Sequence, residues 1–328
     1  MSALLDLRVA CEMARLRARA AAWRRRGSAH AAWPVAPPYR KVFIVGCPRS
    51  GTTWIRRLVA HHAQVISGPE SHAYPQVLGA FVELGLRGAA GWHRVLDRYR
   101  RGARRNLAIG LHHWVGRPAL HRFIAAALAD PERPDEAAAE RVVQAIFDAY
   151  VLAHGGTADH VLLEKTPHHV FWADRILRHD PHARVVEVLR DGRDVCVSME
   201  MRARTQRWSP AERAAQIATW VRFVSHGLAL RSEPAFADRI LLVRFEDVKA
   251  DPLVQAERLL RFMGLGGSRA EVAEAVEAVS IDRHPRKGEG RHVRKGAVGD
   301  WRTHFSAEDR ALFDREAGPL FEQVGYTR

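Results

Sequence analysis

The sequence predicts an α/β fold in which helices flank a mostly parallel central sheet. Four short apolar runs have the length and the β-branched content of buried strands, as expected for strands covered on both faces. Helical patterns separate these runs, which is typical of a parallel sheet. A glycine-containing turn follows the first run and leads into a helix. The expected strands cover residues 42–45, 161–163, 184–189 and 240–243.

The N-terminal segment, residues 1–40, has a helical pattern rich in arginine, followed by a proline-rich stretch. Charged residues, Glu12 among them, interrupt its apolar part, which is unlike the apolar core of a secretory signal. We expect a solvated surface helix, with weak contact to a membrane surface or another protein as the alternative. Three prolines between residues 31 and 41 predict an extended linker, so the main domain should cover residues 41–328.

Residues 68–160 differ from the rest because they contain no convincing strand pattern. They hold several aromatic residues and histidines and an alanine-rich stretch broken by proline. We interpret them as a helical insertion between the first and second expected strands. Such an insertion is a natural place for the pocket of a second substrate.

Two helix starts are marked by serine. Ser209 is followed by Pro210 and by Glu212, which predicts a capped start with proline in the first turn. Ser306 and Asp309 show the same spacing and predict a second capped start.

The chain of 328 residues carries a formal net charge of +14, and only five of its 51 basic residues are lysine. Abundant arginine and alanine indicate a coding bias, which weakens any argument from charge alone. The charge is compatible with an anionic ligand, a nucleic acid or a lipid surface. Because no nucleic-acid-binding motif accompanies it, we expect no nucleic-acid partner.

Cysteine content and hydropathy limit the remaining classes. Three cysteines are too few and too scattered for a disulfide framework or a zinc site. Cys47 and Cys196 lie in apolar runs and should be buried thiols. No uninterrupted apolar run approaches the roughly 18 residues of a membrane span, so we expect a soluble, cytoplasmic protein.

The first turn reads "GCPRSGTTW" and has the outline of a phosphate-binding loop, with four residues between Gly46 and Gly51. In a nucleoside-triphosphate loop a lysine follows the second glycine, whereas Thr52 stands there in this chain. The backbone N–H groups of such a loop and the helix start behind it suit an anion without that lysine. Thr52 and Thr53 add hydroxyl donors, and Arg49 adds a positive charge that can stabilise a transferring group.

Two later segments also carry anion-binding residues. In "VVEVLRDGRDVCVSM", Arg190 follows the end of a strand and Ser198 lies eight residues further on. Charges at the carboxyl end of a strand lie on the binding edge of an α/β sheet, although an ion-paired turn of Asp and Arg is the alternative. In the segment 281–306, Arg294 and Lys295 lie beside glycines and can wrap an anion, or form a solvated basic loop.

The motifs "PRSGTTW", "LRDGRDVCVS" and "RKGAVGDWRTHF" together resemble those of the family of sulfotransferases that use PAPS, 3′-phosphoadenosine-5′-phosphosulfate. The resemblance covers residues 42–306 and implies a P-loop-like α/β fold. It also implies PAPS as co-substrate and PAP, 3′,5′-ADP, as product. By the same resemblance, the 5′ side would be bound by Arg49, Ser50, Gly51, Thr52 and Thr53, the adenine by Trp54 and Phe245, and the 3′-phosphate by Arg190, Ser198, Arg294, Lys295 and Gly296. Phe245 stands where the family has tyrosine, which removes a hydroxyl.

The same resemblance supplies a catalytic set. Glu70 lies 21 residues after Arg49, where members similar to protein-tyrosine sulfotransferase have their base. Lys165 lies just after an expected strand, at the position where the family has its catalytic lysine. His72 and His168 are alternative bases. The histidine that small-molecule members place two residues after the lysine is missing, because Pro167 occupies that position.

The sequence thus predicts an enzyme that moves the sulfonate group from PAPS to a hydroxyl of a small metabolite, a saccharide or a lipid, with no metal requirement. Glu70 would be the base, and Arg49 and Lys165 would stabilise negative charge. The alternatives are an ATP enzyme similar to P-loop kinases and a non-catalytic relative that binds PAP. The pattern leaves the acceptor and the oligomeric state open.

Overall fold

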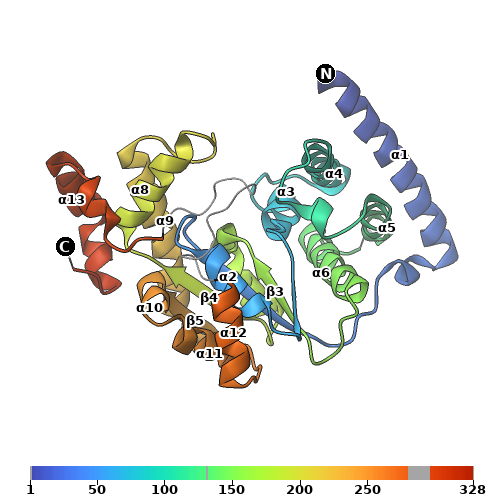
Figure 1. The fold of residues 1–328 in the computed structure, drawn as a ribbon. Coiled ribbons are helices and arrows are strands. Elements are labelled where there is room, and N and C mark those ends of the chain that lie inside the picture. Colours follow the sequence, from blue (N-terminus) through green and yellow to red (C-terminus); the bar gives the residue numbers. More distant parts are fainter. Residues whose placement is uncertain (1, 131, 280–295, 328) are drawn as a thin grey trace. The chain divides into compact units, whose positions relative to one another are not determined.

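In the computed structural model, which describes residues 2–130, 132–279 and 296–327, five strands form one sheet in the order β2-β3-β1-β4-β5 (Figure 1). Two compact units make up the chain. The helical unit contains residues 1–40 and 66–166, and the core unit contains residues 41–65 and 167–328.

The core unit carries most of the expected strands. Within it, β1 pairs in parallel with β4 and β4 with β5, so that Ile44 lies opposite Val186 and Val186 opposite Leu241. The expected parallel arrangement is thereby confirmed for these three strands. The elements of this unit are β1 (Arg40–Gly46), α2 (Thr52–Ala60), α7 (Ala173–His179), β4 (Arg184–Leu189), α8 (Gly192–Ala203), α9 (Arg213–Arg231), β5 (Ile240–Arg244), α10 (Phe245–Ala250), α11 (Pro252–Phe262), α12 (Arg269–Ala278) and α13 (Ala307–Gln323).

The helical unit contains the expected insertion. Residues 68–130 and 132–160 form helices and turns without a strand, as the sequence predicts. A three-residue strand directly before them, β2, was not expected because it is too short to show a pattern. The elements are α1 (Ser2–Arg26), β2 (Val65–Ser67), α3 (Gly79–Phe81), α4 (Gly88–Arg104), α5 (Arg117–Leu128), α6 (Asp135–Ala153) and β3 (Val161–Lys165).

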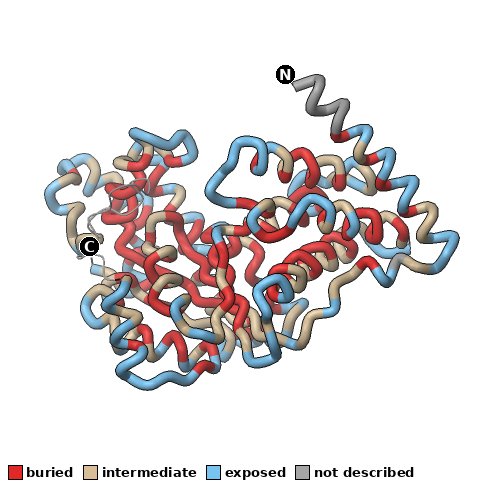
Figure 2. The backbone as a smooth tube through the Cα atoms, turned by 45° about the vertical axis from the view of Figure 1, so that its right-hand side comes forward, coloured by how far each residue is buried: buried red, intermediate tan, exposed pale blue. Residues whose placement is uncertain are grey.

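Helix α1 is anchored to its own unit along one face. Val9, Met13 and Leu16 recur every three or four residues and are buried, and α1 packs on α4 and α5. Figure 2 shows buried and exposed positions alternating along this helix. Glu12 accepts a hydrogen bond from Arg100 at 2.6 Å, which ties α1 to α4. A weak membrane contact through the arginines of the outer face stays a prediction. None of the described helices is long and apolar enough to cross a bilayer.

One of the two expected helix caps is present and the other is wrong. Ser306 and Asp309 form a reciprocal capping box at the start of α13. Ser209 caps no helix, because its buried hydroxyl donates to the carbonyl oxygen of Met199 at 2.8 Å. Helix α9 therefore begins four residues later, with Glu212 at its N-cap.

The end of β1 is fixed by a glycine with no room for a side chain. Gly46 has a φ of +137° and lies opposite Val188 of β4. A Cβ atom at this position would clash with the backbone carbonyl of Val188. The close approach of two strands thus dictates glycine where the anion-binding turn begins.

Replacing Gly46 with alanine should lower the free energy of unfolding by roughly 2 kcal/mol or more, because strained backbone and a steric clash add together. Urea titration measures the change. Gly266→Ala is the matched control, since a Cβ there meets open space. Equal stability of the two variants would contradict the role given to Gly46.

Candidate active site

The loop between β1 and α2 has the backbone of an anion cradle. Arg49 and Gly51 adopt positive φ values of 76° and 93°, and Ser50 donates its N–H to the carbonyl oxygen of Cys47 at 3.1 Å. Helix α2 starts directly behind the loop at Thr52. Successive N–H groups in such a turn, with the positive end of a helix behind them, attract an anion.

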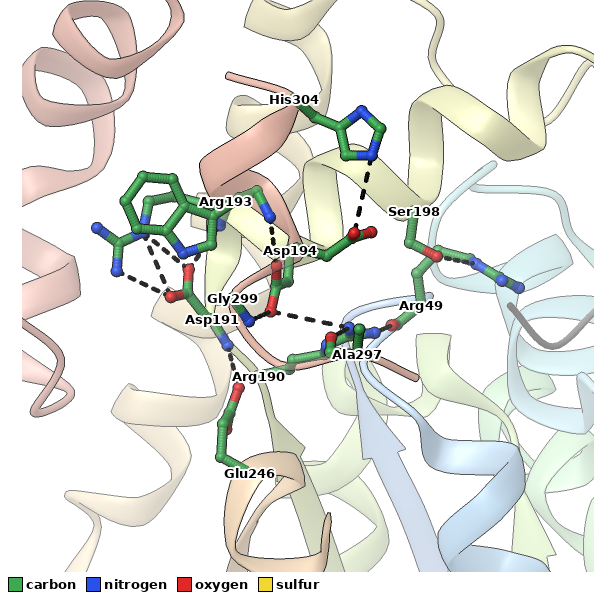
Figure 3. Close-up of polar contacts among 12 residues, drawn as sticks. Arg49, Arg190, Asp191, Arg193, Asp194, Ser198, Glu246, Ala297, Gly299 and His304 are labelled. Carbon is green, nitrogen blue, oxygen red and sulfur yellow. Dashed lines mark hydrogen bonds and ion pairs between the residues drawn. The ribbon is translucent and has the colours of Figure 1, made fainter. Parts of the chain in front are cut away.

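Arg49, Arg190 and Ser198 come together in the core unit (Figure 3). The Nε atom of Arg49 donates to Ser198 Oγ at 3.0 Å, and Arg190 donates to the carbonyl oxygen of Arg49 at 3.2 Å. Burial, together with the positive charges of Arg202 and Arg190, lowers the pKa of Arg49 to about 10. This corner of the core unit therefore concentrates positive charge away from water, which an anion would offset.

Arg190 is held by several partners and still has an unused donor. It donates to the carbonyl oxygen of Ala297 at 2.9 Å, and its guanidinium lies 4.3 Å from the ring centre of Phe245. Its distance to Asp194 is 3.9 Å, the outer limit of an ion pair. The buried Nε atom has no hydrogen-bond partner among the described residues. Burial lowers the pKa of Arg190 despite the acidic residues nearby.

The carboxylate of Asp194 mainly accepts hydrogen bonds from the backbone of the segment after residue 295. It accepts hydrogen bonds from the backbone N–H groups of Gly299 at 2.8 Å and Trp301 at 2.9 Å. The third motif is thus tied to the start of α8 (Figure 3). Gly296, with a φ of 57°, lies at the beginning of this segment, whereas Arg294 and Lys295 lie outside the described residues.

Asp191 and Arg193 form the ion-paired turn that was the alternative interpretation of this motif. Asp191 caps α8 by accepting from the Arg193 N–H at 2.9 Å, and their side chains pair at 2.8 Å. The guanidinium of Arg193 also lies 3.9 Å from the ring centre of Trp301. Asp191 and Arg193 therefore build the turn, whereas Arg190 and Ser198 face Arg49.

Arg202 is a member of this cluster that the sequence interpretation missed. It is buried, lies one helical turn after Ser198 on α8, and acts on the pKa of Arg49. Among the described residues no carboxylate pairs with it, and its buried Nε has no hydrogen-bond partner. The available sequence signal was its position four residues after Ser198, on the same helix face. That signal is weak, because the chain contains so many arginines.

The residues expected around the adenine lie beside the same loop. Trp54 and Phe245 meet edge to face with ring centres 5.5 Å apart. A side chain at Gly51 would collide with the Phe245 ring, so the aromatic ring packs directly on the loop backbone. Phe245 thus occupies a place beside the loop without the hydroxyl of a tyrosine.

The expected base and lysine form a pair within the helical unit. Glu70 contacts Lys165 Nζ with Oε1 and His72 Nε2 with Oε2, the latter at 3.2 Å. Burial opposes ionisation of Glu70, but the hydrogen bond from His72 and the charge of Lys165 prevail and lower its pKa to about 2. The Lys165 side chain is only 5% exposed and that of Glu70 is 21% exposed, so the pair is shielded from water yet reachable.

The second alternative base, His168, belongs to the core unit. It is exposed and lies edge-on to Phe223, with ring centres 5.1 Å apart. His72, by contrast, shares the Glu70 carboxylate with Lys165. Of the two histidines, His72 is therefore the one in direct contact with the expected catalytic residues.

Comparison with known proteins identifies the class. A model of the sulfotransferase family matches residues 41–268. The match covers more than half of the chain, and the protein therefore belongs to the sulfotransferase family. The sequence motifs and the P-loop-like α/β fold predicted from them agree with this assignment.

Individual relatives are distant. Cytosolic sulfotransferase 17 of Arabidopsis thaliana is 26% identical over 175 residues, which are 44% of this chain and 51% of that protein. Cytosolic sulfotransferase 4 of the same plant is 26% identical over 159 residues, or 45% of this chain and 56% of that protein. The chain spans about half the length of these curated relatives. The solved sulfotransferase domain of the Synechococcus PCC 7002 olefin synthase shares the fold, with a TM-score of 0.50, 21% identity, and coverage of 90% of this chain and 97% of that domain.

Sodium sulfate should raise the melting temperature by several degrees at millimolar concentration, since an anion that binds only the folded state stabilises it. Arg202→Met should remove most of this increase, because the loss of one charged donor costs about 1.5–3 kcal/mol of binding. Differential scanning fluorimetry at constant ionic strength measures both.

The matched control is Arg204→Met, which removes an exposed arginine near the end of the same helix that pairs with Glu200 at 3.8 Å. It should respond to sulfate as the wild type does. An unchanged sulfate response in Arg202→Met would exclude Arg202 from the anion site.

Proposed function

We propose that this protein is a PAPS-dependent sulfotransferase that transfers a sulfonate group to an acceptor hydroxyl. The observation that carries the proposal is the cluster of Arg49, Arg190 and Arg202 beside the glycine loop. The buried Nε atoms of Arg190 and Arg202 have no hydrogen-bond partner among the described residues and are available to a phosphate group of PAPS. Thr52 is consistent with this ligand, because PAPS has no γ-phosphate for a lysine at that position to reach.

The binding residues divide between the two ends of the nucleotide. The loop backbone and the hydroxyls of Thr52 and Thr53 would hold the 5′-phosphosulfate. Trp54 and Phe245 would lie against the adenine. The 3′-phosphate would be bound by Arg190, Ser198, Arg202 and Gly296, together with Arg294 and Lys295. Buried donors such as Ser50 Oγ, which has no partner among the described residues, are available for either end.

The proposed reaction is an in-line displacement at sulfur. The acceptor oxygen forms a bond to sulfur while the bond from sulfur to the bridging oxygen of the 5′-phosphate breaks, and PAP leaves. Glu70 takes the proton of the acceptor hydroxyl, and Lys165 and Arg49 stabilise the negative charge on the sulfonate and leaving oxygens. Positioning and charge supply most of the rate enhancement in such loose transition states.

The acceptor class stays broad in this proposal. A small metabolite, a saccharide or a lipid can each present the hydroxyl, and the helical unit that carries Glu70 is where the acceptor would bind. A cytoplasmic location fits the plant relatives, which are named cytosolic sulfotransferases, and stays a prediction for this chain.

Glu70→Gln should reduce kcat by about 100-fold or more while the affinity for PAP changes less than threefold, because the amide keeps the size but cannot accept the proton. Turnover of radiolabelled PAPS with a host metabolite extract and calorimetric titration with PAP measure the two quantities. Full activity of Glu70→Gln would exclude Glu70 as the base.

The pH dependence of kcat separates a carboxylate base from a histidine base. Glu70, with a pKa of about 2, is a carboxylate from pH 5 to 7, so it predicts no acid limb in that range. A histidine base would produce an acid limb, because a protonated imidazole cannot take the proton of the acceptor. Such a limb, if His72→Gln abolished it, would assign the base to His72.

Nucleotide choice distinguishes the proposal from its rivals. PAP should raise the melting temperature strongly and without magnesium, whereas Mg-ATP should have little effect, because the site has no lysine for a γ-phosphate. Stabilisation by Mg-ATP alone would favour a kinase-like enzyme. PAP binding with no sulfate transfer to any of a broad acceptor panel would favour a non-catalytic relative.

A further inference from the structure

A second acidic residue, Glu164, lies beside the Glu70–Lys165 pair and is completely buried. It precedes Lys165 on β3, and successive side chains of a strand point to opposite faces. Glu164 is therefore directed away from the side on which Lys165 meets Glu70. A buried carboxyl group is costly unless hydrogen-bond donors satisfy it.

Three donors converge on one oxygen of Glu164. Oε1 accepts from the backbone N–H of Ser71 at 3.0 Å, from Ser71 Oγ at 2.8 Å and from Thr166 Oγ1 at 2.6 Å. Ser71 directly follows Glu70 in the chain, and Thr166 directly follows Lys165. The carboxylate thus joins the two backbone positions next to the proposed catalytic residues.

The turn that carries Glu70 is held at its other end by the same network. Thr166 Oγ1 also accepts from the backbone N–H of His72 at 3.3 Å, and Ser71 Oγ accepts from the N–H of Ala73 at 3.1 Å. His72 has a left-handed φ of 51°, a conformation that costs a non-glycine residue about 1–3 kcal/mol and persists only where neighbours enforce it. Glu164 and Thr166 are the neighbours that do so here.

We propose that Glu164, acting through Ser71 and Thr166, is the positioning residue that fixes the Glu70 turn on the end of β3. By holding that turn, it sets the contact of Glu70 with Lys165 and with His72. This inference rests on the proposed function, which makes Glu70 and Lys165 the reacting groups. The proposed role of Glu164 is positioning, because it acts on the reacting groups through Ser71 and Thr166.

The chemistry of the side chain explains why a carboxylate is used. One carboxylate oxygen can accept several hydrogen bonds at once, and an ionised acceptor makes stronger bonds than a neutral one. A leucine of similar size would leave the Ser71 N–H and the Thr166 hydroxyl buried without an acceptor, at about 1–3 kcal/mol each. The turn would then relax, and the Glu70 carboxylate would move off Lys165.

The decisive test compares Thr166→Val with Thr166→Ser. Valine keeps the shape and removes the hydroxyl that links Glu164 to the His72 N–H, whereas serine keeps the hydroxyl. Thr166→Val should lower kcat at least tenfold with PAP affinity unchanged within twofold, and Thr166→Ser should stay within threefold of the wild type. Glu164→Gln, which keeps an acceptor oxygen, should fall between them, and Glu164→Ala should be at least as impaired as Thr166→Val.

A purely structural role would lower stability but leave the titration of Glu70 unchanged. Positioning predicts that Thr166→Val raises the pKa of Glu70 from about 2 toward the ordinary value of about 4.3. Carbon-13 NMR of glutamate-labelled protein, with the Glu70 signal identified by its loss in Glu70→Gln, measures this shift without any turnover.

The two hypotheses can fail separately. If no acceptor is sulfated by the wild type but the Glu70 signal shifts in Thr166→Val, the proposed function fails and the positioning role stands. If sulfation is observed and Thr166→Val leaves both kcat and the Glu70 titration unchanged, Glu164 is no positioning residue.

Discussion

The crowding of buried guanidinium groups beside a glycine loop is the constraint on which the functional account depends. Arg49, Arg190 and Arg202 each lose hydration, and the positive charges of Arg202 and Arg190 act against that of Arg49. Burying like charges is unfavourable unless a ligand of opposite charge arrives. A bound anion would offset this cost, which fits the membership of the chain in the sulfotransferase family.

The glycine loop shows how one backbone can serve different anions. Gly46 and Gly51 leave room for the neighbouring strand and for the Phe245 ring, while Arg49 adopts a left-handed conformation. None of these features depends on a lysine at position 52. With threonine there, charge comes from Arg49 and from α8, so the loop alone does not define the ligand.

Much of the fold and of the candidate site could be predicted from the sequence, because the patterns that predict them lie within short segments. The apolar runs of β1, β4 and β5 and the glycine loop follow directly from composition and spacing. The contacts of Arg190 and Ser198 with Arg49 were not predicted, because the motifs assign these residues to different ends of the nucleotide. The contacts that the sequence did not predict share one cause, because in each the hydrogen-bonding partner is distant in the sequence. The pattern around Ser209 predicts a helix cap, but in the structure its hydroxyl donates to the carbonyl oxygen of Met199. Glu164 carries no signal in the sequence, because its hydrogen bond with Ser71 exists only in the folded chain.

Calorimetric titration of the wild-type protein with PAP and with 5′-AMP measures directly whether the arginine cluster binds the 3′-phosphate. The two nucleotides differ only in the 3′-phosphate, which Arg190, Ser198 and Arg202 should bind through several charge-assisted hydrogen bonds, each contributing about 1.5–3 kcal/mol. The account predicts that PAP binds about 100-fold more tightly than 5′-AMP or better, and that this ratio falls in Arg202→Met. Equal affinity for the two nucleotides would contradict it.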